Sequence, residues 1–193
     1  MASLVLSGDT SGSITVAAPA VAGSNTQTLV AATGTLAPLI SGTAVTASST
    51  SVDFTSIPSW VKRITVMLQG VSTNGTSNLQ LQIGAGSVTT SGYSSYAQIF
   101  NGSTLTNTGT VTTGFVIWTS AITDNKTGVY TLVLLTGNTW VCTGNAFQSS
   151  SQSSQTSGAI ALGGTLDRLR IIASATGSPS DTFDAGTINI LYE

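Results

Sequence analysis

Apolar residues recur at every second position along several short runs of this chain. Ile64, Val66 and Leu68 form the first clear run of this kind. A repeat of two is that of a β-strand, whose neighbouring side chains point to opposite faces. Similar runs follow at 79–84, 96–100, 114–120, 129–135, 139–143, 168–174 and 187–193. Because turn-forming residues separate the runs and no segment has a capped helical stripe, the pattern predicts an all-β fold, an antiparallel β-sandwich of the jelly-roll type.

Three local patterns add detail to this fold. Residues 61–84 are expected to form a β-hairpin, because two alternating runs flank an Asn74-Gly75 step that suits a turn with positive φ. Residues 149–158, SSSQSSQTSG, are low in complexity and are expected to form a solvent-facing loop. Cys142, the single cysteine, lies in an apolar run and is expected to be buried in the core.

The chain carries very little charge. Its 193 residues include five Lys and Arg, seven Asp and Glu and no His, which gives a net charge of -2. Five cations cannot neutralise a run of phosphates or form a polybasic patch, so we expect neither nucleic-acid binding nor membrane insertion. Since 40% of the residues are apolar, the chain is expected to fold and not to be disordered.

The residue types also limit the chemistry. Without histidine, Ser-His-Asp and Cys-His nucleophiles are excluded, and so are histidine-ligated metals. Asp181 and Asp184 are the candidates for a carboxylate pair. Two acids around a phenylalanine are more typical of a turn than of a glycoside hydrolase or a calcium site. We therefore expect no enzyme activity, no cofactor and no metal.

Lys62 and Arg63 are the only adjacent cations in the chain. Neighbouring strand residues face opposite sides, so the two do not form one basic patch. A solvated start of a strand accounts for both. The alternative is that Arg63 forms a structural or intersubunit ion pair. The acids available for such a pair are Asp53, Asp167, Asp181 and Asp184.

Aromatic side chains are the remaining candidates for recognition. Trp60, Trp118 and Trp140 lie in or beside strand runs, where packing in the core is the commoner role. Tyr93 and Tyr96 lie in the polar segment TSGYSSYAQ. We expect these two tyrosines to be the most exposed aromatic residues and the candidates for surface recognition.

The first fifty residues differ in kind from the rest. They contain no aromatic residue, one charged residue (Asp9) and short runs of small apolar side chains. Such a segment cannot bury enough apolar surface alone to offset its conformational entropy. We therefore expect residues 1–45 to be an extended β segment that is stabilised by copies of itself or by a partner. Residues 52–193 are expected to form the sandwich.

Two parts of the chain resemble structural proteins of tailed bacteriophages. Near the N-terminus, LVLSGDTSGSITVAAPAVAGSNTQTL is similar to a module that begins small virion proteins. Further on, DFTSIPSWVKRITVMLQGVSTNGTSNLQLQIG, SGYSSYA and LDRLRIIASATGSPSDTFDAGTINILYE resemble a C-terminal module of tail-fibre and related virion proteins. The resemblance implies a non-enzymatic protein of the virion surface, a homotrimer whose N-terminal segment binds other capsid or tail proteins.

The resemblance leaves two placements open. A tail-fibre or tail-tip protein would act in host attachment, with a cell-surface glycan as its partner. A capsid decoration, cement or head-fibre protein would stabilise the head. Outside this class, the alternatives are a carbohydrate-binding module and a glycan depolymerase. The start of the sequence, MASLVLSGDTSG, shows no signal peptide, so we expect synthesis in the host cytoplasm.

Overall fold

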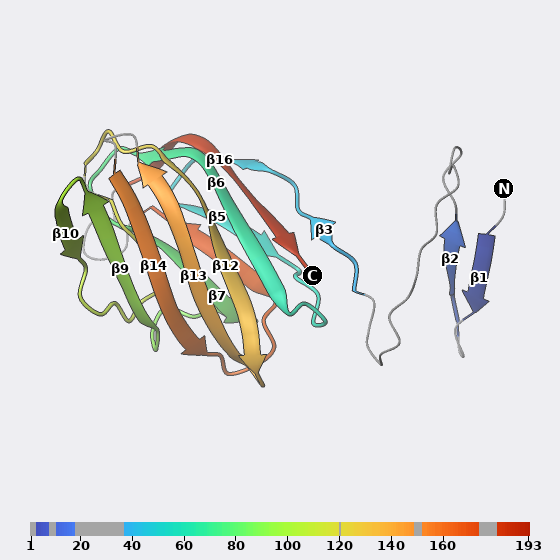
Figure 1. Cartoon of the computed structure of the whole chain (residues 1–193). Coiled ribbons are helices and arrows are strands. Elements are labelled where there is room, and N and C mark those ends of the chain that lie inside the picture. The colour runs from blue at the N-terminus through green and yellow to red at the C-terminus, as the bar shows by residue number, and fades with distance from the viewer. Residues whose placement is uncertain (1–2, 8–10, 18–36, 120, 149–151, 174–180) are drawn as a thin grey trace. The chain divides into compact units, whose positions relative to one another are not determined.

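The computed structural model describes residues 3–7, 11–17, 37–119, 121–148, 152–173 and 181–193 (Figure 1). The chain divides into two units, Met1–Leu36 and Ala37–Glu193. The described residues form strands, turns and irregular segments, with no helix among them. The all-β prediction is therefore confirmed.

The first unit contains a β-hairpin. β1 (Ser3–Ser7) pairs antiparallel with β2 (Ser13–Ala17), and Leu6 lies opposite Ile14. Leu6, Ile14 and Val16 share one face of the hairpin, and they are 55%, 69% and 60% exposed. An isolated two-stranded hairpin is only marginally stable in water. This one therefore needs another surface against which to pack its apolar face.

The second unit is a sandwich of two antiparallel sheets (Figure 1). The large sheet has the order β10-β9-β14-β13-β12-β6-β16-β3, and β4 also pairs with β16. Its strands are β3 (Ile40–Ser41), β4 (Val45–Thr46), β6 (Arg63–Thr73), β9 (Ser94–Asn101), β10 (Thr104–Asn107), β12 (Lys126–Thr136), β13 (Thr139–Gln148), β14 (Gln152–Ala161) and β16 (Phe183–Tyr192). The small sheet has the order β11-β7-β15-β5, with β8 paired to β7. Its strands are β5 (Ser51–Thr55), β7 (Leu79–Ala85), β8 (Ser87–Val88), β11 (Phe115–Ile117) and β15 (Arg168–Ile172).

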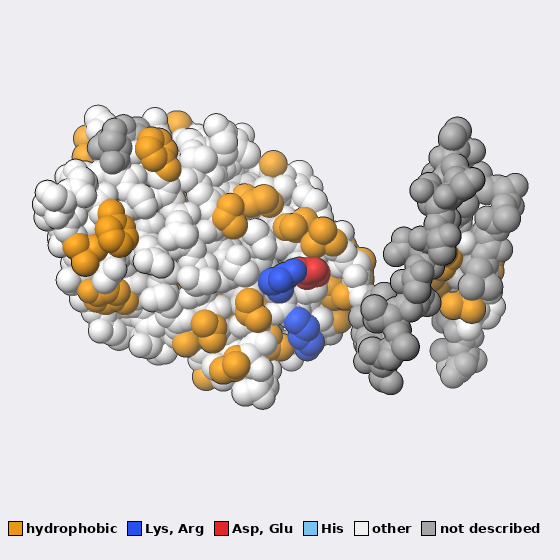
Figure 2. Space-filling model, in the orientation of Figure 1, with side chains coloured by type: hydrophobic (Ala, Val, Ile, Leu, Met, Phe, Trp, Pro, Cys, Tyr) orange, Lys and Arg blue, Asp and Glu red, His pale blue; other side chains and the backbone are white. Residues whose placement is uncertain are grey.

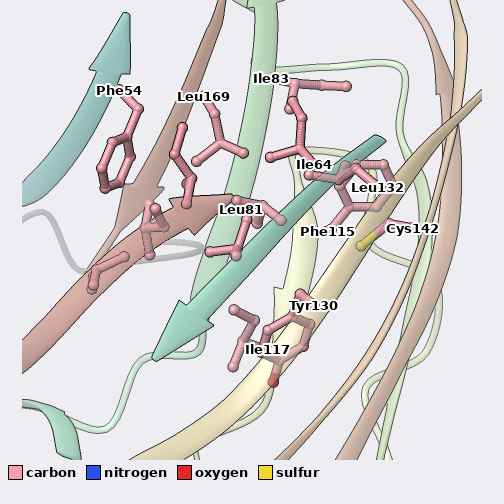
Figure 3. Packing of buried hydrophobic residues seen from close by; sticks show 14 of the residues in the cluster. Phe54, Ile64, Leu81, Ile83, Phe115, Ile117, Tyr130, Leu132, Cys142 and Leu169 are labelled. Atoms are coloured by element: carbon pink, nitrogen blue, oxygen red, sulfur yellow. The ribbon is translucent and has the colours of Figure 1, made fainter. Parts of the chain in front are cut away.

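The core lies between the inner faces of the two sheets (Figure 3). Leu81 and Leu169 of the small sheet and Ile64 and Leu132 of the large sheet are fully buried in one cluster. Each occupies an inward position of the period-two pattern. Burying a side chain of this size stabilises a fold by about 1.5–3 kcal/mol. The second unit thus has a core of its own.

Gly144 shapes this core through the space that it leaves for Tyr130. The Tyr130 ring lies over Gly144 of the neighbouring strand β13, where an added Cβ would clash with the ring. The side chain is fully buried, and burial raises the pKa of its hydroxyl, which lies beside Ser154 and Thr156 of β14. Gly144 therefore lets Tyr130 reach across β13 to β14.

β6 and β7 do not form the expected hairpin. β6 lies in the large sheet between β12 and β16, whereas β7 lies in the small sheet between β11 and β15. The loop between them passes from one sheet to the other. Gly75 has no positive φ; instead, the carboxyl group of Asp181 packs so closely against it that a Cβ would clash. The Asn74-Gly75 step therefore serves a close approach between loops.

The prediction of a loop at 149–158 is also wrong for the residues that the structure describes. Residues 152–161 form β14, and residues 149–151 lie outside the described residues. Ser154 and Thr156 point inward and are fully buried. The Thr156 hydroxyl donates to the Val116 carbonyl at 2.6 Å, and the Ser154 hydroxyl lies 3.5 Å from the Ala146 carbonyl. Because backbone carbonyls accept these protons, a serine-rich strand can lie inside a sheet.

Residues 37–45 belong with the sandwich and not with the N-terminal segment. Ile40 of β3 and Val45 of β4 pair with β16, and the nearby Ala47 is buried. The boundary expected near residue 45 therefore moves to Ala37.

The tryptophans differ from one another in burial. Trp140 and Cys142 are 2% and 0% exposed, which confirms their expected places in the core. Trp118 follows β11 and is half-buried. Trp60 is 38% exposed and packs at an angle on Tyr192, with ring centroids 6.0 Å apart. Core packing was thus predicted correctly for Trp140 and only in part for the other two.

Candidate interaction surface

The large sheet has a face that points away from the small sheet. We define the outer face as the outward side chains of β9, β14, β13 and β12. They are Ser94, Tyr96, Gln98 and Phe100; Ser153, Gln155, Ser157 and Ala159; Val141, Thr143, Asn145 and Phe147; and Thr127, Val129, Thr131 and Val133. Strand alternation places these side chains together, because most residues between them are buried in the core.

Strand register arranges the polar side chains of the outer face in rows. Residues directly opposite each other on neighbouring strands share a face, with their Cβ atoms about 4.5–5.5 Å apart. One row is Thr131, Thr143, Ser157 and Tyr96; the next is Val129, Asn145, Gln155 and Gln98. The outer face therefore presents a line of hydroxyls beside a line of amides.

No side chain of the outer face is charged. Its apolar members are well exposed: Phe147 by 57%, Val129 by 48% and Phe100 by 45%. Figure 2 shows this side of the sandwich as a largely uncharged surface with separate hydrophobic patches, and the charged side chains visible there lie together in one small cluster. Depletion of charge together with exposed aromatic residues is typical of binding surfaces.

Tyr93 and Tyr96 have different surroundings. Tyr96 is half-buried and ends the hydroxyl row on the outer face. Tyr93 is 2% exposed, so the prediction that it is a surface residue is wrong. Its single hydroxyl proton lies within reach of the carbonyls of Ile83 and Thr89, at 3.1 and 3.0 Å, and the hydroxyl oxygen accepts from the Ile83 N–H at 2.8 Å. Burial raises the pKa of Tyr93 to about 12.

Arg63 forms an ion pair with Glu193, an acid that was absent from the expected partners. The two residues are cross-strand neighbours, since the Glu193 N–H donates to the Arg63 carbonyl at 3.0 Å. The pair is largely exposed, and such pairs contribute about 0–1 kcal/mol. The other arginines pair with Asp167 and Asp53, so each arginine has a carboxylate within its own chain.

Asp181 and Asp184 do not act together. The buried Asp181 carboxylate accepts the Ser77 N–H at 3.0 Å and packs on Gly75, so it fixes the loop after β6. Asp184 accepts a hydrogen bond from the Ser72 hydroxyl. These contacts fit the expected structural role, but neither acid pairs with Arg63.

Lys126 is a buried cation that the sequence analysis did not single out. It begins β12 on the inward side, like Tyr130 and Leu132, and is 0% exposed. Its Nζ has no hydrogen-bond partner in the structure. Burial lowers the pKa of Lys126 to about 8, although the charge of Asp124 opposes this shift. The alternation of β12 could have revealed it, because the inward residues have even numbers.

The outer face is the best candidate site in the part of the chain that the structure describes. Among the described residues, no group of three or more His, Cys, Asp or Glu is placed to hold a metal ion. No helix in that part of the chain is long and apolar enough to cross a membrane. No family model, curated protein or solved structure matches the sequence or the fold. Functional inference therefore rests on the residues themselves.

Proposed function

We propose that the protein is a non-enzymatic structural component of a tailed-phage virion. Met1–Leu36 attaches it to the particle, and Ala37–Glu193 projects as a β knob that takes part in host-surface attachment at a tail fibre or tail tip. The observation that carries the proposal is the division into two unlike units. One unit presents a hairpin with an exposed apolar face, and the other has its own core. The resemblance to virion proteins supplies the class.

A structural role agrees with the chemistry of the described residues. Asp181 and Asp184 are each held by a separate hydrogen bond, so they do not form the acid and base of a hydrolase. Lys126 and Cys142 are fully buried, and burial raises the pKa of the Cys142 thiol. Neither nucleophile can meet a substrate in this state.

Antibody labelling of purified phage particles tests the placement. We expect label at the tail, with a copy number that is a multiple of three. Label distributed over the head would instead support the decoration or head-fibre alternative. Absence of the protein from purified particles would overturn the proposal.

A homotrimer is expected for the full chain. Three hairpins that pack their Leu6, Ile14 and Val16 side chains together would remove from water the apolar surface that a single hairpin exposes. Sedimentation equilibrium should give a mass about three times 19.4 kDa. A monodisperse monomer at micromolar concentration would contradict this expectation.

A further inference from the structure

We infer that the outer face binds a neutral polysaccharide that lies across β12, β13, β14 and β9. This inference deepens the host-attachment role and rests on it. Its basis is the juxtaposition of an amide row, a hydroxyl row and exposed rings on one uncharged face.

The absence of charged side chains on the outer face indicates the class of ligand. A polyanion or an acidic glycan would find no cation on β12, β13, β14 or β9 outside the buried Lys126. Arg63 lies at the border of the face and is already paired with Glu193. A charged ligand would lose its hydration on this face without gaining an oppositely charged partner. A neutral ligand needs no such partner, so electrostatic complementarity favours it.

The polar rows match the hydrogen-bonding pattern of sugars. Each amide of Asn145, Gln155 and Gln98 offers both donors and acceptors, and so does each pair of neighbouring sugar hydroxyls. Because the three amides occupy successive strands, an extended ligand that crosses the strands meets them in turn. The hydroxyl row ending at Tyr96 runs beside it and provides a second set of partners.

Exposed rings supply the apolar half of sugar recognition. Phe100 and Phe147 lie on the outer face in the row beyond the amides, each opposite Ser153 of β14. They are 45% and 57% exposed. The C–H face of a sugar ring packs well on such a ring while its hydroxyls reach the neighbouring polar side chains. Tyr96, at the end of the hydroxyl row, adds a third ring to the outer face.

A second copy of the chain fits this face less well. A dry protein interface would bury the amides of Asn145 and Gln155 together with the hydroxyls of Thr131, Thr143 and Ser157. Each group would then need a matched partner, because buried polar groups without one are costly. A polysaccharide provides hydroxyl partners along its whole length and leaves room for bridging water.

The test uses the full-length chain and a printed array of neutral and acidic bacterial polysaccharides. We expect binding to at least one neutral polysaccharide, with little change when salt is raised. The double variant Asn145→Ala/Gln155→Ala should bind that polysaccharide at least about tenfold more weakly, because it loses two amides from one row. Both side chains are exposed, so the thermal melt should stay close to that of the wild type.

Asn101→Ala is the matched control. Asn101 is an exposed amide at the end of β9, on the opposite side of the strand from Phe100, and its removal should leave binding unchanged. The inference fails if no neutral polysaccharide binds, if only acidic ones bind, or if the double variant binds as the wild type does. It also fails if the double variant loses self-association instead of glycan binding. Antibody label on particles together with any of these results would leave the structural role intact.

Discussion

Removal of residues 1–36 is expected to leave the sandwich folded and to abolish its binding to phage particles that lack the native protein. The truncated chain starts at Ala37, because β3 and β4 pair with β16. It keeps the whole buried cluster and should melt cooperatively. Without residues 1–36, the segment that we propose as the attachment site is gone. Co-sedimentation with particles measures binding, and circular dichroism follows the melt.

Variants of the full-length hairpin sharpen this test. Leu6→Asn and Ile14→Asn place an amide on the apolar face that three hairpins are expected to bury together, so each should weaken trimer formation and, with it, particle binding strongly. Thr15→Asn lies opposite Val5 on the other face and should have little effect. Since the three substituted residues and their strands carry no charge, binding should depend weakly on salt. Binding of the truncated chain to particles would place attachment in the sandwich and overturn the assignment.

The strands of this protein could be predicted from sequence because alternation is a local property. The pairing of strands could not. Asn74-Gly75 is compatible with a hairpin turn, and its actual role depends on Asp181, whose carboxylate binds Ser77 across a separation of 104 residues. A single sequence contains no signal for such a contact. The serine-rich β14 was missed for a similar reason, since the carbonyls that accept from Ser154 and Thr156 lie on other strands.

The candidate surface was predictable in part. Alternation alone indicates that Asn145 shares a face with Thr143 and Phe147. That Gln155 and Gln98 lie beside Asn145 depends on strand register, which comes from the fold. Tyr96 is half-buried and less exposed than Trp60, so it is not among the most exposed aromatic residues as expected. Tyr93 was misjudged from its polar neighbours. Its buried hydroxyl is satisfied by the backbone of Ile83 and Thr89, so a polar context in sequence did not imply exposure.

Lys126 makes the stability of the sandwich depend on pH. Its ammonium group is buried without a hydrogen-bond partner, and the pKa of Lys126 falls from 10.5 to about 8. Below pH 8 both the folded and unfolded chains hold the proton, so the folded state bears the full cost of a buried charge. Between pH 8 and 10.5 the folded chain loses the proton while the unfolded chain keeps it. The free energy of unfolding should therefore rise with pH across this window.

Lys126→Met is expected to increase the free energy of unfolding near neutral pH by up to about 3 kcal/mol, since a pKa shift of one unit corresponds to about 1.4 kcal/mol. It should also remove the rise between pH 8 and 10.5, because the group that titrates there is gone. Urea denaturation at several pH values measures both effects. The pH series should stop at about pH 9.5, because ionisation of tyrosine in the unfolded chain lowers the free energy of unfolding above this value.

Lys62→Met is the matched control, because Lys62 is exposed immediately before β6. Its substitution should change the free energy of unfolding by less than about 0.5 kcal/mol and leave the pH dependence as in the wild type. The two lysines thus separate the effect of burial from that of removing one positive charge. If Lys126→Met lowers stability at neutral pH, the ammonium must gain more from Asp124 than it loses by burial. If the rise with pH persists in that variant, another group is responsible for it. Either result would show that the folded chain does not hold Lys126 as an unpaired buried cation.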